Sequence, residues 1–301
     1  MEIIEEIRAL KQRRNALILA HYYVDGQIQA VADYVGDSYF LSKKAAETDC
    51  DLIVFCGVRF MAESAKLLNP GKTVLLPDAG ADCPMAHMAG VREIEEMRET
   101  HPDLAVVCYI NSTAEIKAHS DVCVTSSNAV KVVSALPNST IYFIPDGNLA
   151  RYVAEKVPEK RFLYGHGHCP VHQAVTEGDV RAAKARHPQA QVLVHPECPK
   201  EVVELSDYAG STAGIIEYAG KSQAEEFIIG TEIGVMYELE RRNPGKRFYP
   251  VKDGMICPDM KLNSLQNLLA ALKDGKNAVT LSEERMKNAL PPLKRMHEIA
   301  Q

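Results

Sequence analysis

A long internal repeat constrains the fold of this chain more than any other feature. Three cysteines, Cys83, Cys169 and Cys257, lie in loops rich in Gly, Asp, His and Pro, and they are separated by 86 and 88 residues. Other motifs recur in the same register, so a chance spacing of cysteines does not explain the pattern. A repeat of this length predicts an array of homologous units.

Each repeat has an apolar segment that ends in two polar side chains with one residue between them. The segments ALILAHYY, LAVVCYIN and QVLVHPE carry these pairs, which are His21 with Tyr23, Tyr109 with Asn111, and His195 with Glu197. A hydroxyl residue follows at the expected start of a helix in each repeat: Ser38, Ser126 and Thr212. The common register indicates that these residues occupy equivalent places in three related units.

The apolar segments are short, continuous and rich in Val, Ile and Leu, which is typical of strands buried on both faces. Helical segments alternate with them, so the sheets are expected to be mostly parallel with right-handed crossovers. We predict an α/β protein of three homologous three-layer αβα domains, related by pseudo-threefold symmetry around a central site. The expected limits are 1–84, 85–170 and 171–262, with C-terminal helices over 263–301 packing against the first domain.

Charge and hydropathy exclude several classes of partner. The net charge is −6, which favours neither nucleic acid nor an anionic membrane. The longest apolar segments are shorter than the roughly 20 residues of a membrane span. The first residues resemble an amphipathic charged helix and not a targeting segment. The sequence therefore predicts a cytoplasmic protein with no nucleic-acid or membrane partner.

The eight cysteines divide into two groups. Cys56, Cys108 and Cys123 lie in apolar, strand-like segments and are expected to be core residues. The three cysteines of the repeat are candidate metal ligands. Three thiolates suit an iron–sulfur cluster with one open iron, which could act as a Lewis acid. Zinc is the alternative, because three histidines flank Cys169 in the segment GHGHCPVH.

The polar residues admit more than one interpretation. The three hydroxyls are N-caps or anion ligands, because a helix N-terminus attracts carboxylates and phosphates. Glu197, between two prolines, is expected to shuttle protons if a closed site raises its pKa. Two other functions stay open from these residues: a zinc- or iron-dependent hydrolase, and a non-catalytic protein that binds a ligand or senses redox state.

Several long segments resemble the quinolinate synthase family. They include IQAVADYVGDS, VTSSNAV, GHCPVHQ and STAGII, in the family's order, and the resemblance extends from about Ile18 to Ala271. The resemblance implies an enzyme of NAD biosynthesis that condenses iminoaspartate with dihydroxyacetone phosphate to quinolinate, phosphate and water. It also implies one 4Fe–4S cluster, held by the three repeat cysteines and leaving one iron open as a Lewis acid.

The resemblance assigns roles to the other residues. The implied catalytic residues are Tyr23, Tyr109, Glu197 and His195. The implied substrate-binding residues are His21, Ser38, Asn111, Ser126, Thr212 and His172. An aspartate oxidase or dehydrogenase is a possible functional partner as the source of iminoaspartate. The segment after Tyr23 departs from the family pattern, and Pro258, Asp259 and Met260 follow Cys257 where some members carry further cysteines, so no local redox switch is expected.

Overall fold

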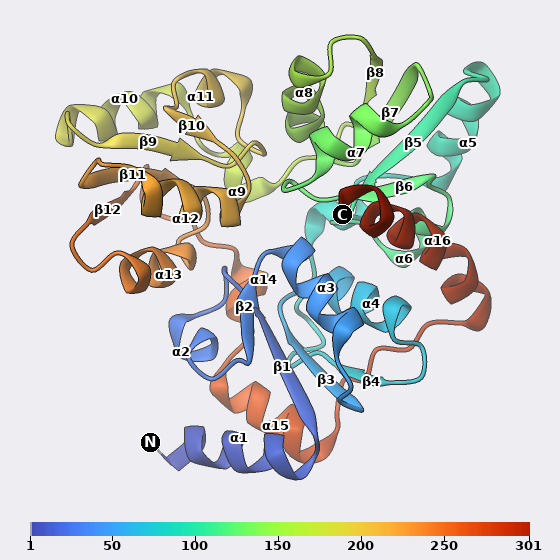
Figure 1. Ribbon diagram of the computed structural model, residues 1–301, viewed down its shortest axis with the longest axis vertical. Helices are drawn as coiled ribbons and strands as arrows, with labels where there is room; N and C mark the ends of the chain where they lie inside the picture. Colours follow the sequence, from blue (N-terminus) through green and yellow to red (C-terminus); the bar gives the residue numbers. More distant parts are fainter. Residues whose placement is uncertain (1) are drawn as a thin grey trace.

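Three four-stranded parallel sheets form the framework, one from each repeat of the sequence. The computed structural model describes residues 2–301. The strand orders are β2-β1-β3-β4, β6-β5-β7-β8 and β10-β9-β11-β12, so the three sheets share one topology. The three units surround a common centre, as Figure 1 shows. This arrangement confirms the predicted α/β fold with three similar three-layer units around a central site.

The first unit begins with a helix whose inward face buries Ile7 and Leu10, and every residue of its first strand is buried. Its elements are α1 (Glu2–Arg13), β1 (Ala16–His21), α2 (Gly26–Gln29), β2 (Tyr34–Gly36), α3 (Ser38–Glu47), β3 (Leu52–Cys56), α4 (Arg59–Leu68), β4 (Thr73–Leu75) and the 3-10 helix η1 (Pro84–His87).

The second unit repeats this order, and its first strand is again completely buried. Its elements are α5 (Val91–Thr100), β5 (Leu104–Tyr109), α6 (Ala114–Ala118), β6 (Val122–Val124), α7 (Ala129–Ala135), β7 (Thr140–Ile144), α8 (Gly147–Lys156), β8 (Arg161–Tyr164) and α9 (Pro170–Gln173). Cys108 and Cys123 are paired across β5 and β6 and are fully buried, as expected for core residues.

The third unit follows the same plan, and its apolar residues form two smaller clusters, one of which includes Tyr22 of the first unit. Its elements are α10 (Glu177–Arg186), β9 (Gln191–Val194), α11 (Lys200–Glu204), β10 (Tyr208–Ala209), α12 (Thr212–Lys221), β11 (Glu226–Gly230), α13 (Val235–Arg242), β12 (Arg247–Pro250) and α14 (Pro258–Lys261).

An aspartate before each second strand has the same role in all three units. Asp33, Asp121 and Asp207 each accept a hydrogen bond from a backbone N–H of the neighbouring first strand, at 2.8, 2.7 and 2.7 Å. The backbone N–H of each aspartate in turn donates to that same residue of the first strand. The repeat is therefore visible in side-chain contacts as well as in topology.

The two C-terminal helices pack against different units. Helix α15 (Leu265–Asp274) packs against α1 and β3 of the first unit, as expected for the C-terminal segment. Helix α16 (Glu283–Ala300) instead packs mainly against α6, β6 and α7 of the second unit and also contacts α4 (Figure 1). Its buried face, which includes Leu293 and Met296, joins one apolar core shared by the first two units.

The expectation that both C-terminal helices stay with the first unit is therefore wrong for α16. The intervening segment runs along the edge of the first sheet, where Leu76 N–H donates to Asn277 and Val279 N–H donates to Val74. This path delivers α16 to the second unit. The predicted domain limits themselves remain a prediction.

The carboxyl ends of the first strands face the centre of the molecule. In an open parallel sheet, ligands bind beyond these ends, where the order of the strands reverses. Here that point lies between the first and third strands of each unit. Within residues 2–301, no helix has both the length and the apolar composition needed to cross a membrane.

Candidate active site

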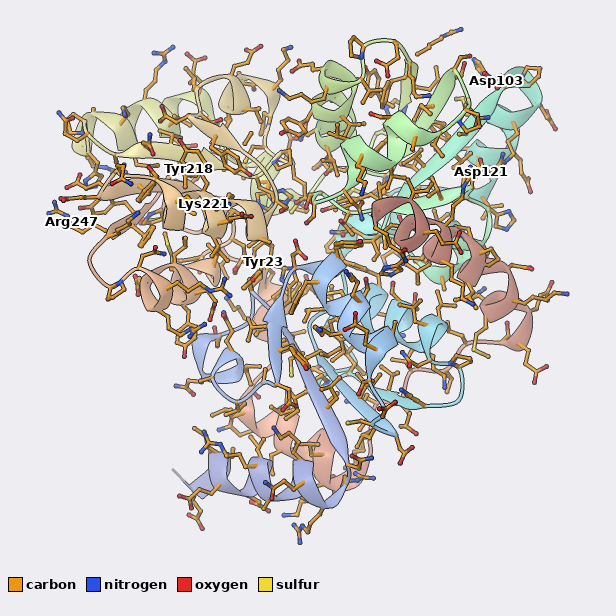
Figure 2. All side chains as sticks on the ribbon, viewed as in Figure 1. Tyr23, Asp103, Asp121, Tyr218, Lys221 and Arg247 are labelled. Carbon is orange, nitrogen blue, oxygen red and sulfur yellow. The ribbon has the colours of Figure 1, made fainter. Side chains whose placement is uncertain are left out.

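One cavity at the meeting point of the three units brings together all the residues that the sequence predicted for the site. Figure 2 shows Tyr23 at this meeting point. The predicted residues that line the cavity are His21, Tyr23, Ser38, Cys83, Tyr109, Asn111, Ser126, Cys169, His172, His195, Glu197, Thr212 and Cys257. Each unit contributes the polar pair that ends its first strand.

The three cysteines occupy equivalent positions in the backbone. Each one is the N-cap of a short helical turn whose first residue is proline, in η1, α9 and α14. Proline suits that position because its fixed φ matches the helix and its missing N–H would have no partner there. Cys83, Cys169 and Cys257 are only partly exposed. Burial raises the pKa of all three thiols, to about 11 for Cys257.

Two histidines present the same nitrogen to the cavity. The backbone N–H of Tyr23 donates to Nδ1 of His21 at 3.2 Å, and that of Glu197 donates to Nδ1 of His195 at 3.3 Å. A ring nitrogen that accepts cannot carry the proton, so Nε2 of each neutral ring is the donor. Burial lowers the pKa of His21 to about 3 and that of His195 to about 4, so both rings are neutral near pH 7.

A chain of close polar contacts crosses the cavity from the first unit to the third. The hydroxyl of Tyr23 lies 2.8 Å from Oγ1 of Thr212 and 2.7 Å from Oγ1 of Thr231. Nε2 of His172 lies 2.9 Å from the same Thr231 oxygen, and its Nδ1 lies 2.7 Å from Oε2 of Glu197. The chain fixes the orientation of Tyr23 and His172 relative to Glu197.

Glu197 differs from the expectation that a closed site would raise its pKa. Burial does oppose its ionisation, but His195 and His172 outweigh burial and lower its pKa to about 2. The phenol of Tyr109 also contributes to the lowered pKa of Glu197 and so favours the carboxylate. Glu197 is therefore an anion at neutral pH and a proton acceptor, not a resting acid.

The hydroxyl residues are not N-caps. Asp37 caps α3 by accepting from the N–H of Phe40, and Ser211 caps α12 by accepting from the N–H of Gly214. Ser38 and Thr212 are the first residues within these helices, and both line the cavity, where the Thr212 hydroxyl contacts that of Tyr23. Ser126, the third hydroxyl residue, lies before its helix and not at its start, because α7 begins only at Ala129.

Comparison with known proteins gives one consistent family. The model of the family described as "Quinolinate synthetase A protein" matches residues 5–298. The quinolinate synthases of Caldicellulosiruptor saccharolyticus and Caldicellulosiruptor bescii are 50% and 51% identical to the chain, over 99% and 98% of its length and 99% and 97% of theirs. That of Clostridioides difficile is 46% identical over 100% of this chain and 99% of its own.

The chain belongs to the quinolinate synthetase A family. It is an enzyme, as the curated members of the family are named. The match spans all three units and α15 and α16, so it includes every residue that lines the cavity.

The chemistry of the cavity fits the iron–sulfur cluster that membership of this family implies. The three thiols share the cavity with an apolar wall formed by Val58, Phe60, Met61, Met85, Val171 and Met260. Thiolates are the usual ligands of such clusters, and a hydrophobic shell limits access of water. Among residues 2–301, Asn111 Oδ1 and Thr125 Oγ1 are buried without a hydrogen-bond partner, so the cavity also offers free polar atoms to a ligand.

The zinc alternative fits the geometry less well. Cys169, His172 and Glu197 have ligand atoms within 4.8 Å of one another and could hold a single ion. However, Nδ1 of His172 lies only 2.7 Å from Oε2 of Glu197, which leaves little room for an ion between them, and its Nε2 lies 2.9 Å from Oγ1 of Thr231. The other two histidines of GHGHCPVH do not line the cavity, and His166 is exposed.

Sequence reasoning missed several polar residues of the site. Asp37 and Glu232 line the cavity, Thr231 connects Tyr23 with His172, and Asp146 contacts the loop of Cys169. A signal was present, because Asp146 and Glu232 follow the third strands of their units with the same 86-residue spacing as the other repeat motifs.

Proposed function

We propose that the enzyme is a quinolinate synthase that condenses iminoaspartate with dihydroxyacetone phosphate, releasing quinolinate, phosphate and water. The observation that carries this proposal is the meeting of three equivalent cysteines and three strand-end polar pairs in one cavity. Such a cavity suits a small, polar, multiply charged substrate that needs contacts on several sides. Family membership supplies the reaction, and the cavity supplies residues suited to it.

Neutral donors would bind the anionic groups of the substrates. The part of the cavity that the structure describes has no Lys or Arg in its lining. Ser38 and Thr212 lie in the first turns of ten-residue helices, where exposed N–H groups and the helix dipole favour phosphate and carboxylate. The Nε2–H groups of His21 and His195, together with Ser126 and Asn111, add further donors.

Cys83, Cys169 and Cys257 would hold a 4Fe–4S cluster. When bound, its open iron would supply Lewis acidity that polarises an oxygen of the substrate. Each of the three thiols loses its proton on binding, and because burial raises their pKa values, ligation releases protons.

The protein's own residues would move the protons of the reaction. Glu197 is the ionised carboxylate of the cavity and would accept a proton from a C–H group next to an imine or carbonyl. Because its low pKa makes it a weak base, that C–H group would have to be acidified by the Lewis acid described above. The contact of Glu197 with His172 gives that proton a route toward Thr231 and Tyr23. Tyr23 and Tyr109 are neutral phenols, since burial raises their pKa values further, and they would act as hydrogen-bond donors.

The wider role would be in NAD biosynthesis in the cytoplasm. Imines hydrolyse readily in water, so a mostly buried site would protect the substrate during condensation. An aspartate oxidase or an aspartate dehydrogenase is the class of enzyme that would supply iminoaspartate.

Anaerobic purification followed by iron, sulfide and visible-absorbance measurements tests the cofactor. We expect four irons and four sulfides per chain, and loss of the visible absorbance in Cys83→Ala, Cys169→Ala and Cys257→Ala. Cys50→Ala is the matched control, because Cys50 has similar partial exposure but lies outside the cavity. Quinolinate formation from iminoaspartate and dihydroxyacetone phosphate tests the reaction.

Two results would contradict the proposal. Stoichiometric zinc without iron would favour the Cys169, His172 and Glu197 ion site. A protein that holds its cluster but forms no quinolinate from these substrates would separate the cofactor from the reaction.

A further inference from the structure

Two buried carboxylates hold the backbone of two cysteine loops. Oδ2 of Asp146 accepts a hydrogen bond from the backbone N–H of Cys169 at 3.2 Å. Oε1 of Glu232 accepts from the backbone N–H of Cys257, also at 3.2 Å. Asp146 is 0% exposed and Glu232 is 1% exposed. Carboxylates this deeply buried are uncommon unless a specific partner requires them.

The two carboxylates occupy the same position in their units. Each lies just beyond the third strand, two residues after β7 and β11 respectively. The corresponding residue of the first unit is Val58, whose apolar side chain cannot accept a hydrogen bond. There the N–H of Cys83 donates at 2.7 Å to Asp82, its own neighbour in sequence, whose side chain is 36% exposed.

We propose that Asp146 and Glu232 are positioning residues that fix the loops of Cys169 and Cys257 before the cluster binds. Neither residue contacts substrate in this assignment, and both act through the cysteine backbone. The loop of Cys83 shares the backbone contact at the end of the third strand, where the N–H of Arg59 donates to the carbonyl of Ala81 at 2.9 Å, but among the described residues no carboxylate from another segment accepts from the N–H of Cys83. This inference rests on the proposed function, because it presupposes a cluster on the three thiols.

Both oxygens of each carboxylate accept a hydrogen bond from a backbone N–H. Oδ1 of Asp146 accepts from the N–H of Leu149 at 2.7 Å, which caps α8, while Oδ2 accepts from Cys169. Oε2 of Glu232 accepts from the N–H of Gly234 at 2.6 Å, and Oε1 also lies 3.1 Å from Nζ of Lys261. A side-chain amide has one acceptor oxygen and one NH2 group, so Asn or Gln would place an N–H of that group against a backbone N–H.

Close backbone packing surrounds the contact between Asp146 and the Cys169 loop. The N–H of Gly147 donates to the carbonyl of Gly167 at 2.9 Å, two residues before Cys169. A Cβ atom at Gly167 would lie 2.8 Å from the carbonyl oxygen of Pro145, so only glycine permits this approach. The loop of Cys169 therefore packs directly on the residues after β7 at Gly167.

The Glu232 contact links the cysteine loop to the first unit. Nζ of Lys261, in the turn that follows Cys257, donates at 2.6 Å to the carbonyl of Tyr23. A Cβ atom at Gly234 would lie 2.7 Å from the backbone of Tyr23. Glu232 therefore ties Cys257 to the segment that carries the Tyr23 hydroxyl, across the boundary between the third and first units.

The test compares Asp146→Asn and Glu232→Gln with wild type after anaerobic reconstitution with iron and sulfide. We expect both variants to load the cluster more slowly and to lose its visible absorbance to an iron(II) chelator roughly 10- to 100-fold faster, the usual effect of losing a residue that orients a metal ligand. Thermal unfolding of the apoproteins shows whether each variant is folded.

Asp82→Asn is the matched control. Its amide oxygen can still accept from Cys83, and its NH2 group can face Nε2 of His87, which lies 2.9 Å from Oδ2. We expect wild-type loading and chelator rates for this variant. Equal rates for wild type, Asp146→Asn and Glu232→Gln would overturn the inference. Failure of the wild type itself to load a cluster would instead overturn the proposed function.

A measurement on the unaltered apoprotein covers the case in which both variants fail to fold. Backbone hydrogen exchange should show the amides of Cys169 and Cys257 protected without metal, because each is bonded to a buried carboxylate. Exchange of either amide at the rate of an unprotected loop would contradict preformed loops, whatever the variants do.

Discussion

Nδ1 of His172 and Oε2 of Glu197 lie 2.7 Å apart, and both side chains are almost completely buried. The two residues come from different segments, α9 and the loop after β9, so only the folded chain brings them together. The contact stabilises the carboxylate form of Glu197 and connects it through Thr231 to Tyr23. It places a proton acceptor beside a relay of hydrogen-bonding groups.

Glu197→Gln should fold and bind the cluster but lose activity by roughly 10²- to 10⁴-fold, the usual contribution of a general base. The amide has the same shape and retains an oxygen near His172, but it cannot accept the proton. Steady-state turnover and the visible spectrum of the cluster provide the measurement. Glu201→Gln, an exposed acid four residues away, is the control. Near-normal turnover in Glu197→Gln would remove it from the proton-transfer role.

Tyr23→Phe should destabilise the protein by about 1–3 kcal/mol, since it removes the buried hydroxyl shared by Thr212 and Thr231. Turnover should also fall, because Thr231, which contacts His172, loses the Tyr23 hydroxyl that orients it. Chemical denaturation and a quinolinate assay measure the two effects. Tyr218→Phe is the control, as this partly buried ring stacks on Tyr208 and has no hydroxyl hydrogen bond among the described contacts. Wild-type stability and rate in Tyr23→Phe would show that the connection is dispensable.

Substitution of two neighbouring serines should have different effects, one on substrate binding and the other on the stability of the protein. Ser126 lines the cavity with its Oγ 3.2 Å from Nε2 of His195, whereas Ser127 donates at 2.5 Å to Asp37 of the first unit. Ser126→Ala should raise the KM for an anionic substrate with little change in unfolding free energy. Ser127→Ala should lower the unfolding free energy by about 1 kcal/mol, the net worth of one hydrogen bond. The reverse pattern would contradict both assignments.

Acid should weaken the docking of the last helix through His297. Its ring stacks on Tyr39 of α3, with centroids 5.6 Å apart, and Nε2 lies 3.2 Å from Oγ of Ser42. Burial, aided by Lys43, lowers the pKa of His297 below its usual value of 6.5. The neutral ring therefore contributes stability above about pH 6.5, and this contribution is lost as pH falls toward the lower folded-state pKa.

His297→Phe keeps a stacking ring but cannot be protonated, so its melting temperature should fall less than that of wild type between pH 7 and pH 5. Differential scanning calorimetry across this range makes the comparison. His166→Gln, which changes an exposed histidine, should follow wild type. A wild-type pH dependence in His297→Phe would show that the helix does not sense this titration.

Much of the site was predictable from the sequence because strand ends repeat a local pattern. Strands buried on both faces appear as short apolar segments, and a polar residue that ends such a segment lies at the edge of a sheet where ligands bind. The register of the repeat then gave His21, Tyr109 and His195 equivalent places. The cysteines followed from the same register, and all of these residues line the cavity.

Local sequence patterns could not predict contacts between segments that are distant in the sequence. The pKa of Glu197 depends on His172 and His195, so burial alone suggested the wrong direction. The capping roles of Asp37 and Ser211 depend on where each helix begins, which propensity does not determine to a single residue. The packing of α16 on the second unit depends on the path of the preceding segment along the first sheet.

The sequence by itself determined the repeat, the three parallel sheets and the identity of the residues that meet at their centre. The reason is that continuous apolar strands, and the helices that alternate with them, are local patterns within each repeat. Only the tertiary structure decided which groups touch there, from His172 on Glu197 to Asp146 and Glu232 on the cysteine loops. Charge, proton affinity and ligand geometry depend on distances of a few ångströms between separate units, and those distances exist only once the units have packed.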